Sequence, residues 1–92
     1  MGTDVRGVTF AAASERERAS GLLGWTCFSL GCLRFDGVAV RRTRSGEFRL
    51  SWPVRRDRHG REHAVVRPLD DRSRQLLEAA VFDGLGFQEA SP

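Results

Sequence analysis

The chain has 92 residues, of which 40% are hydrophobic and 29% charged, and this size and composition indicate one soluble globular domain spanning 1–92. Its longest apolar stretch is 21–33, shorter than the ~20 residues that a membrane-spanning helix needs, so we expect no membrane partner. Because the first residues lack the apolar segment of a secretory signal, we expect a cytoplasmic protein.

Positive charge is concentrated in the middle of the chain. All 15 basic residues are arginine; residues 34–74 contain twelve of them against six acids, whereas 75–92 contain three acids and no arginine. Arginine makes bidentate contacts with phosphate, so this block indicates a polyanionic partner such as nucleic acid. A GC-rich coding sequence would also replace lysine by arginine without any function, and that alternative stays open.

The first half of the chain is rich in strand signals. Weak alternation predicts a strand over Val5–Phe10, and the polar run 11–20 is expected to be a solvated loop. The aromatic and glycine-rich segment 21–35 predicts one long, bent strand buried on both faces. Asp36-Gly37 then signals a turn into a strand over 38–41.

The clearest strand is 47–52, where Phe48, Leu50 and Trp52 alternate with polar residues and Pro53 marks the end. Around it, we expect a polar turn at 43–46, a basic loop at 54–60 and a short strand at 62–67.

Helical spacing begins after residue 70. Apolar side chains recur at Leu76, Leu77, Ala80 and Val81, with Asp70 or Asp71 as the N-cap and Gly84 as the stop. These signals predict a helix over about 71–83 and a frayed tail at 86–92. The expected fold class is α+β: a twisted antiparallel sheet of four to five strands with one C-terminal helix packed on it.

Sequence signatures of catalysis are lacking. Cys27 and Cys32 have no second cysteine pair, and we interpret them as small buried side chains rather than as zinc ligands or a disulfide. His59 is expected in a loop and His63 in a strand, without a titrating role. We therefore predict no enzyme activity, no metal and no cofactor; a reactive thiol at either cysteine is the alternative.

The candidate nucleic-acid site combines a basic loop with the first turn of the predicted helix. Its residues are Arg55, Arg56, Arg58, Arg61, Arg72 and Arg74, with a secondary patch at Arg41, Arg42 and Arg44. Cations are unfavourable at a helix N-terminus, and a bound phosphate would explain Arg72 and Arg74. The alternative is that Asp70 and Asp71 simply offset them.

Residues 38–82 resemble the septation regulator family founded by stage V sporulation protein G. The stretch Phe48-x-Leu50-Ser51-Trp52-Pro53 is similar to the family strand that ends in Ala-Met-Pro, with Trp52 in place of methionine. A basic pair, a glycine turn and Val65-Val66-Arg67-Pro68-Leu69 follow at the family's spacing, and Arg74 matches the arginine of its helix start. Residues 10–33 are longer and more apolar than in the family.

The resemblance implies a small homodimeric regulator that binds DNA and RNA through the basic loop and the helix start. In the family this affects gene expression, cell division and, where the host sporulates, septation, without catalysis or cofactor. The alternative function is a protein–protein adaptor, in which the apolar 21–35 segment and Trp52 form an interface and the arginines only keep the protein soluble.

Overall fold

The computed structural model describes residues 4–87. Its elements are β1 (Val5–Ala12), α1 (Glu15–Ala19), β2 (Leu22–Leu30), β3 (Leu33–Arg42), β4 (Phe48–Ser51), β5 (Val54–Arg56), β6 (Glu62–Ala64) and α2 (Asp71–Leu85).

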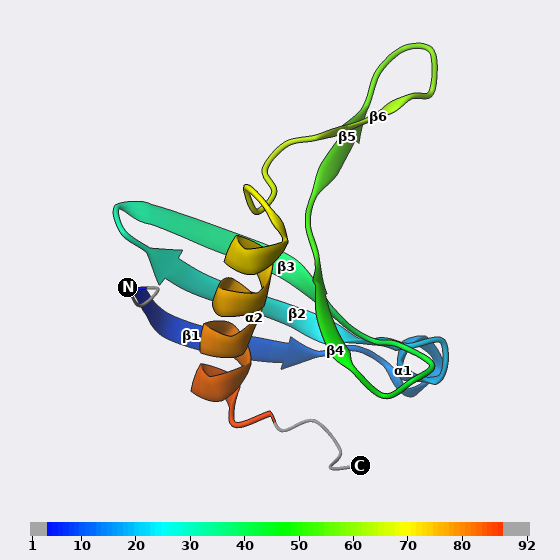
Figure 1. Ribbon diagram of the computed structural model, residues 1–92. Helices are drawn as coiled ribbons and strands as arrows, with labels where there is room; N and C mark the ends of the chain where they lie inside the picture. The colour runs from blue at the N-terminus through cyan, green and yellow to red at the C-terminus, as the bar shows by residue number, and fades with distance from the viewer. Residues whose placement is uncertain (1–3, 88–92) are drawn as a thin grey trace.

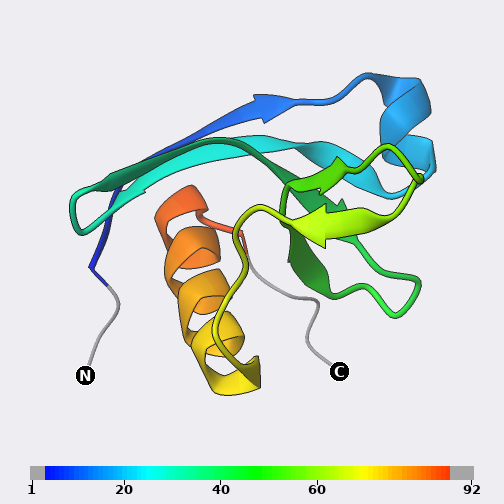
Figure 2. The same cartoon turned by 90° about the horizontal axis from the view of Figure 1, so that it is seen from above.

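Strands β1 to β4 form one antiparallel sheet in sequence order, and α2 lies across one of its faces (Figures 1 and 2). Strands β5 and β6 pair with each other in a separate hairpin. The predicted α+β class, with an antiparallel sheet and a C-terminal helix packed on it, is confirmed. No helix within the described range is long and apolar enough to cross a membrane.

The hydrophobic core lies between α2 and the sheet face that it covers. Phe28, Val40 and Val81 are each 0% exposed, and they come from β2, β3 and α2. The alternation predicted for the fourth strand is confirmed, because Leu50 is buried while Phe48 and Trp52 pack against the same cluster. Burying an apolar side chain of this size contributes about 1.5–3 kcal/mol, so this layer holds the helix on the sheet.

The apolar segment 21–35 is a hairpin, and the prediction of one long strand is wrong. Strand β2 ends at Leu30, Gly31 and Cys32 make a two-residue turn, and Leu33 pairs directly with Leu30. The segment therefore supplies two central strands of the sheet. This placement buries Thr26 and Phe28 completely.

The turn predicted at Asp36-Gly37 is also wrong, because both residues lie inside β3. Thr26 pairs with Val38 and Phe28 with Phe35, so β3 has one residue more than β2 across this interval. Gly37 has φ +73°, a left-handed conformation that glycine adopts at little cost. The dipeptide that usually marks a hairpin turn here forms a β-bulge.

A short helix replaces part of the loop expected over 11–20. Ser14 caps α1: its hydroxyl accepts a hydrogen bond from the Glu17 N–H, and the Glu17 carboxylate accepts one from the Ser14 N–H, both at 3.2 Å. This reciprocal pair is a capping box, and its Ser-x-x-Glu spacing is a sequence signature of a helix start. Strand β1 also continues to Ala12, beyond its predicted end.

Helix α2 begins where the sequence predicted, with the Asp70 carboxylate accepting a hydrogen bond from the Ser73 N–H at 2.7 Å. It runs past the predicted stop at Gly84 and ends at Leu85, and Gly86 forms the C-cap with φ +73°. Gly84 instead permits close approach to β1, because a Cβ there would lie 2.9 Å from Cγ2 of Val8.

The predicted frayed tail is wrong for residues 86–87 and lies outside the described residues for 88–92. The Phe87 ring centroid is 5.2 Å from those of both Phe10 and Phe48, and the ring also stacks on Phe82. Phe87 therefore closes one end of the core beneath α2.

Candidate nucleic-acid interface

The arginines fall into two groups according to whether a carboxylate neutralises them. Five of the 15 have a carboxylate oxygen within 4.0 Å: Arg6, Arg34, Arg49, Arg56 and Arg74. The other ten are exposed and have none within that distance in the part of the chain that the structure describes. They are Arg16, Arg18, Arg41, Arg42, Arg44, Arg55, Arg58, Arg61, Arg67 and Arg72.

The first cluster of unneutralised arginines lies on the β5–β6 hairpin, which extends away from the sheet (Figure 1). Arg55, Arg58 and Arg61 belong to it, and we call them the hairpin cluster. The segment predicted as a basic loop thus contains a paired strand, in which Arg55 lies opposite His63 and Arg56 opposite Glu62. Arg56 is not part of the hairpin cluster, because its guanidinium forms an ion pair of 3.0 Å with Glu62.

The tip of the hairpin is organised by a single carboxylate. Asp57 accepts hydrogen bonds from the backbone N–H groups of His59 at 2.8 Å and Arg61 at 3.0 Å. Its other oxygen lies 2.8 Å from Nε2 of His63. These contacts, above all the one with His63, lower the pKa of Asp57 below its ordinary range. His63 is therefore a structural partner of the turn as well as a strand residue.

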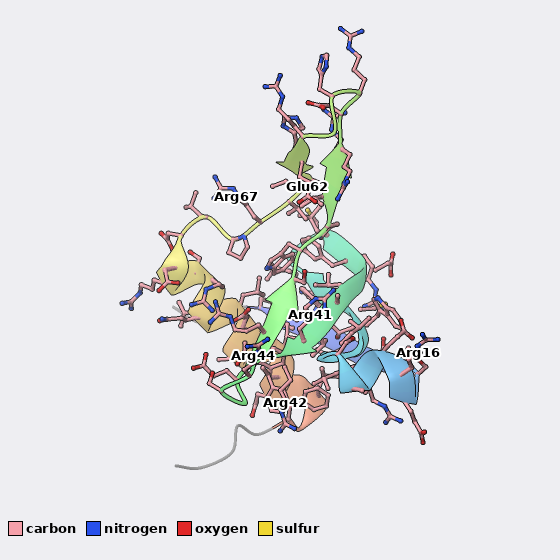
Figure 3. All side chains as sticks on the ribbon, turned by 90° about the vertical axis from the view of Figure 1, so that its right-hand side faces the viewer. Arg16, Arg41, Arg42, Arg44, Glu62 and Arg67 are labelled. Atoms are coloured by element: carbon pink, nitrogen blue, oxygen red, sulfur yellow. The ribbon has the colours of Figure 1, made fainter. Side chains whose placement is uncertain are left out.

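The second cluster lies at the end of the sheet where β3 passes into β4. It contains the predicted patch of Arg41, Arg42 and Arg44, together with Arg16 and Arg18 of α1, and we call these five residues the sheet-end cluster. In Figure 3, Arg41, Arg42 and Arg44 lie on the side of the molecule that faces the viewer, below the hairpin, and Arg16 lies beside them on α1.

Local structure holds the sheet-end cluster in place. The predicted turn at 43–46 is confirmed, with the Gly46 N–H donating to the Thr43 carbonyl at 2.9 Å. A hollow of about 610 Å³ lies between this turn and α1, lined in part by Arg18, Arg42 and Arg44. The guanidinium of Arg42 also lies 5.1 Å from the centre of the Phe48 ring, a cation–π distance.

Sequence reasoning missed Arg16 and Arg18 because it assigned residues 11–20 to a loop. The signal that could have placed them is the capping box of Ser14 and Glu17, which marks the start of a helix and so places both arginines on α1.

The start of α2 is different, because carboxylates of the same chain already occupy it. Arg74 Nη2 contacts Asp71 at 2.7 Å and its Nη1 contacts Glu78 at 2.7 Å, so this predicted phosphate contact is engaged in two ion pairs. The pKa of Arg74 is raised, mainly by the hydrogen bond to Asp71. The pKa of Asp70 is lowered by its hydrogen bonds with Ser73. Of the two predicted helix-start arginines, only Arg72 lacks an acidic partner in the described chain.

Glu78 is the centre of a buried polar network on α2. It is 5% exposed, and one of its oxygens accepts a hydrogen bond from the Leu50 N–H of β4 at 2.9 Å. Its other oxygen accepts a hydrogen bond from Nη1 of Arg74 at 2.7 Å and lies 3.8 Å from Nε of Arg49. Arg49 and Arg74 are thereby assigned to the structure rather than to a ligand.

The two cysteines occupy different environments. Cys27 is partly buried in β2, whereas Cys32 is exposed in the β2–β3 turn, so the expectation that both are buried is wrong for Cys32. Both are free thiols. Among residues 4–87 no group of three or more His, Cys, Asp or Glu side chains is placed to hold a metal ion.

The apolar segment proposed for an adaptor lies mainly inside the sheet, so it offers little free surface apart from its tip, where Leu33 is 58% exposed. Trp52 packs edge-on against Phe28 and Phe35, and its indole N–H is buried without a hydrogen-bond partner. Beside Trp52, an apolar groove of about 310 Å³ runs under the linker to α2, where Leu69 is 84% exposed.

Comparisons of this chain with protein-family models, curated proteins and solved structures found no match.

Proposed function

We propose that this protein is a non-catalytic, cytoplasmic nucleic-acid-binding regulator whose affinity comes from arginine–phosphate contacts. The observation that carries the proposal is the group of ten exposed arginines that have no carboxylate within 4.0 Å among residues 4–87. Eight of them form the hairpin cluster and the sheet-end cluster. Arginines whose charge is not neutralised within the fold are available to displace counterions from a phosphate backbone.

Two features of the clusters are compatible with an extended anionic backbone as the ligand. The hairpin cluster projects from the body of the molecule, where it can reach a backbone without a clash from the sheet (Figure 1). In the sheet-end cluster, Arg18, Arg42 and Arg44 line one hollow of about 610 Å³ between α1 and the β3–β4 turn, so three arginines lie around one open space. The contacts should be largely independent of base sequence, because phosphate contacts position a protein without reading bases.

The resemblance to the septation regulator family supports the regulatory part of the proposal. On that basis the protein would act as a homodimer and affect gene expression, cell division and septation. The resemblance would place Arg55 and Arg56 in the nucleic-acid contact; the ion pair of Arg56 with Glu62 makes Arg55, Arg58 and Arg61 the stronger candidates within this hairpin.

The proposal is tested by fluorescence anisotropy of labelled DNA and RNA across a series of salt concentrations. The wild-type protein should bind at low salt, with the logarithm of the affinity falling linearly with the logarithm of the salt concentration. The variant R55A/R58A/R61A should bind more weakly, and its slope should be shallower by about one for each phosphate contact removed.

A matched control is R6A/R34A/R56A, which removes the same charge from three arginines that are paired with carboxylates. Its salt slope should stay close to that of the wild type once thermal melting has shown that it folds. Equal slopes for the two triple variants would reject the hairpin assignment. The absence of any binding at low salt would reject the proposed function.

A second candidate is the protein–protein adaptor, now favoured by the groove under the linker rather than by the 21–35 segment. Val65, Leu69 and Leu76 are 61%, 84% and 44% exposed, and Leu69 and Leu76 line the groove. Partner capture that survives nuclease treatment and is lost on Leu69→Ser would support this function over nucleic-acid binding.

A further inference from the structure

The face of the β1–β4 sheet opposite α2 carries only the short helix α1, at one end. Figure 2 shows α2 on one side of the sheet, while the opposite side is open along its length except at the end where α1 lies. We call this opposite side the outer face. Antiparallel sheets commonly leave one face in contact with solvent, so the side chains on this face decide whether it binds a partner.

The strand register identifies the residues of the outer face. Val38 and Val40 point into the core, so Ala39 and Arg41, which alternate with them on β3, lie on the outer face. Residues directly opposite each other in antiparallel strands share a face. Ala11, Trp25, Ala39 and Ser51 therefore form one row across the four strands.

Trp25 is the large aromatic side chain in the middle of this row. Its direct neighbours on both sides are alanines, Ala11 and Ala39, which are small side chains. Trp25 is partly exposed, unlike Phe28 of the same strand, which is completely buried. Part of the indole ring is thus accessible on the outer face, between two alanines.

Three arginines and two acids lie near this end of the sheet; of the acids, both on α1, Glu15 is exposed and the Glu17 carboxylate is held by Ser14. Arg41 lies on the same face, two residues along β3 from Ala39, and has no carboxylate within 4.0 Å in the described chain. Arg16 and Arg18 lie on α1, which stands at the end of the sheet on the side away from α2 (Figure 2). A partner that covers Trp25 would extend toward these three arginines, so charge complementarity favours an anionic polymer over a neutral protein surface.

We propose that the outer face binds single-stranded nucleic acid, with a base stacked on the Trp25 indole and the adjoining phosphates on Arg41, Arg16 and Arg18. This inference rests on the proposed function and specifies its ligand. A base in a duplex has both faces covered by its neighbours, so only an unpaired nucleotide can stack on Trp25. An aromatic ring beside a positively charged track is the combination by which proteins hold single strands without sequence preference.

The test compares single-stranded oligothymidine with a hairpin duplex of similar charge, using wild-type protein, Trp25→Leu and Trp25→Phe. The Leu variant should lose on the order of tenfold or more in single-strand affinity, as expected for one base–aromatic stack, with little change for the duplex. The Phe variant should retain most of the affinity, because it keeps a ring. Circular dichroism and thermal melting establish that each variant is folded.

Intrinsic fluorescence provides an independent measurement. In the variant Trp52→Phe, Trp25 is the only tryptophan, and the substitution removes no hydrogen bond because the Trp52 N–H has no partner. Oligothymidine should quench this emission, as a base stacked on the ring does, and should shield it from acrylamide. The variant Trp25→Phe, which retains only Trp52, is the matched control and should show little quenching.

The outcomes separate this inference from the function on which it rests. If neither single strand nor duplex binds at low salt, the proposed function itself is wrong. If both bind, but Trp25→Leu binds as the wild type does and the Trp25 emission is unchanged, only this inference is overturned. A change of oligomeric state in Trp25→Leu, with equal loss for single strand and duplex, would also overturn it and would assign the outer face to a second copy of the chain.

Discussion

The α2 side of the sheet and the β5–β6 hairpin are held by different forces. Under α2, apolar side chains are fully buried and the carboxylate of Glu78 is enclosed with them. In the hairpin, every residue of β5 and β6 is exposed, and order comes from strand pairing, the Arg56–Glu62 ion pair and the hydrogen bonds of Asp57. Substitutions under α2 should therefore lower stability strongly, whereas the hairpin can contain exposed charged residues with little effect on the stability of the fold.

The same contrast explains why identical residue types have different roles. Arg49 and Arg74 surround the buried Glu78, where a charge requires a partner. Arg58 and Arg61 are exposed in the turn of the hairpin, where water solvates them and no partner is required. Burial of the neighbouring carboxylate, more than position in the sequence, separates structural arginines from those available to a ligand.

The largest expected effect comes from removing the buried carboxylate. Glu78→Ala should lower the free energy of unfolding by about 3 kcal/mol, because it leaves two arginines and the Leu50 N–H without their acceptor. Urea denaturation measures the loss. Glu62→Ala, which breaks the exposed hairpin ion pair, is the matched control and should change stability by about 0.5 kcal/mol or less. Equal losses in the two variants would abolish the contrast between the regions.

A smaller effect is expected where α2 lies closest to β1. Alanine is normally favoured over glycine within a helix by about 1 kcal/mol. At Gly84, however, the added Cβ would lie 2.9 Å from Cγ2 and 3.3 Å from Cβ of Val8, so Gly84→Ala should lower the free energy of unfolding by about 1 kcal/mol or more.

A double-mutant cycle identifies the cause. In a Val8→Ala background the contact with Cγ2 is removed, so adding Gly84→Ala should be neutral or stabilising in chemical denaturation. The same loss in both backgrounds would show that the close approach to Val8 is not what selects glycine.

The smallest expected effect is a local pH dependence of the hairpin. The folded-state pKa of Asp57 is lowered, so its contribution is present above the unfolded value of about 3.9 and is lost as the pH falls through the lower folded value. The amide resonances of His59 and Arg61 should shift in this acidic window in NMR spectra. Asp57→Asn should remove these shifts while leaving the titration of the helix cap Asp70 in place. Persistence of the hairpin shifts in Asp57→Asn would assign them to another group.

The sequence was most informative where one local signal acted alone. The alternation of Phe48, Leu50 and Trp52 predicted β4, and the carboxylate at Asp70 predicted the start of α2. The alternation reflects a single buried face of the strand, and the helix start reflects a hydrogen bond between near neighbours in the sequence. The same is true of the polar turn at 43–46.

The errors arose where tertiary context decides between two uses of one signal. Asp36-Gly37 can make a turn or a bulge, and the pairing of β3 with β2 selects the bulge. Gly84 can end a helix or permit close packing, and contact with Val8 selects packing. For the candidate site, composition located the arginines. It could not show that Arg74 is held in an ion pair whereas Arg58 is free to bind a ligand, because Arg74 is held by Glu78, a carboxylate that only the folded structure buries.

The hydrogen bond from the Leu50 N–H to Glu78 bears on how copies of this chain can associate. Strand β4 is the edge of the sheet, and an edge strand with free backbone groups can template pairing with another molecule. Here the Leu50 N–H already donates its hydrogen bond to the Glu78 carboxylate of α2. A second strand that paired with β4 would have to displace this buried carboxylate, which also forms two ion pairs. Growth of the sheet by strand addition, whether in a dimer or in an aggregate, is thus disfavoured at β4 and left to the opposite edge, β1.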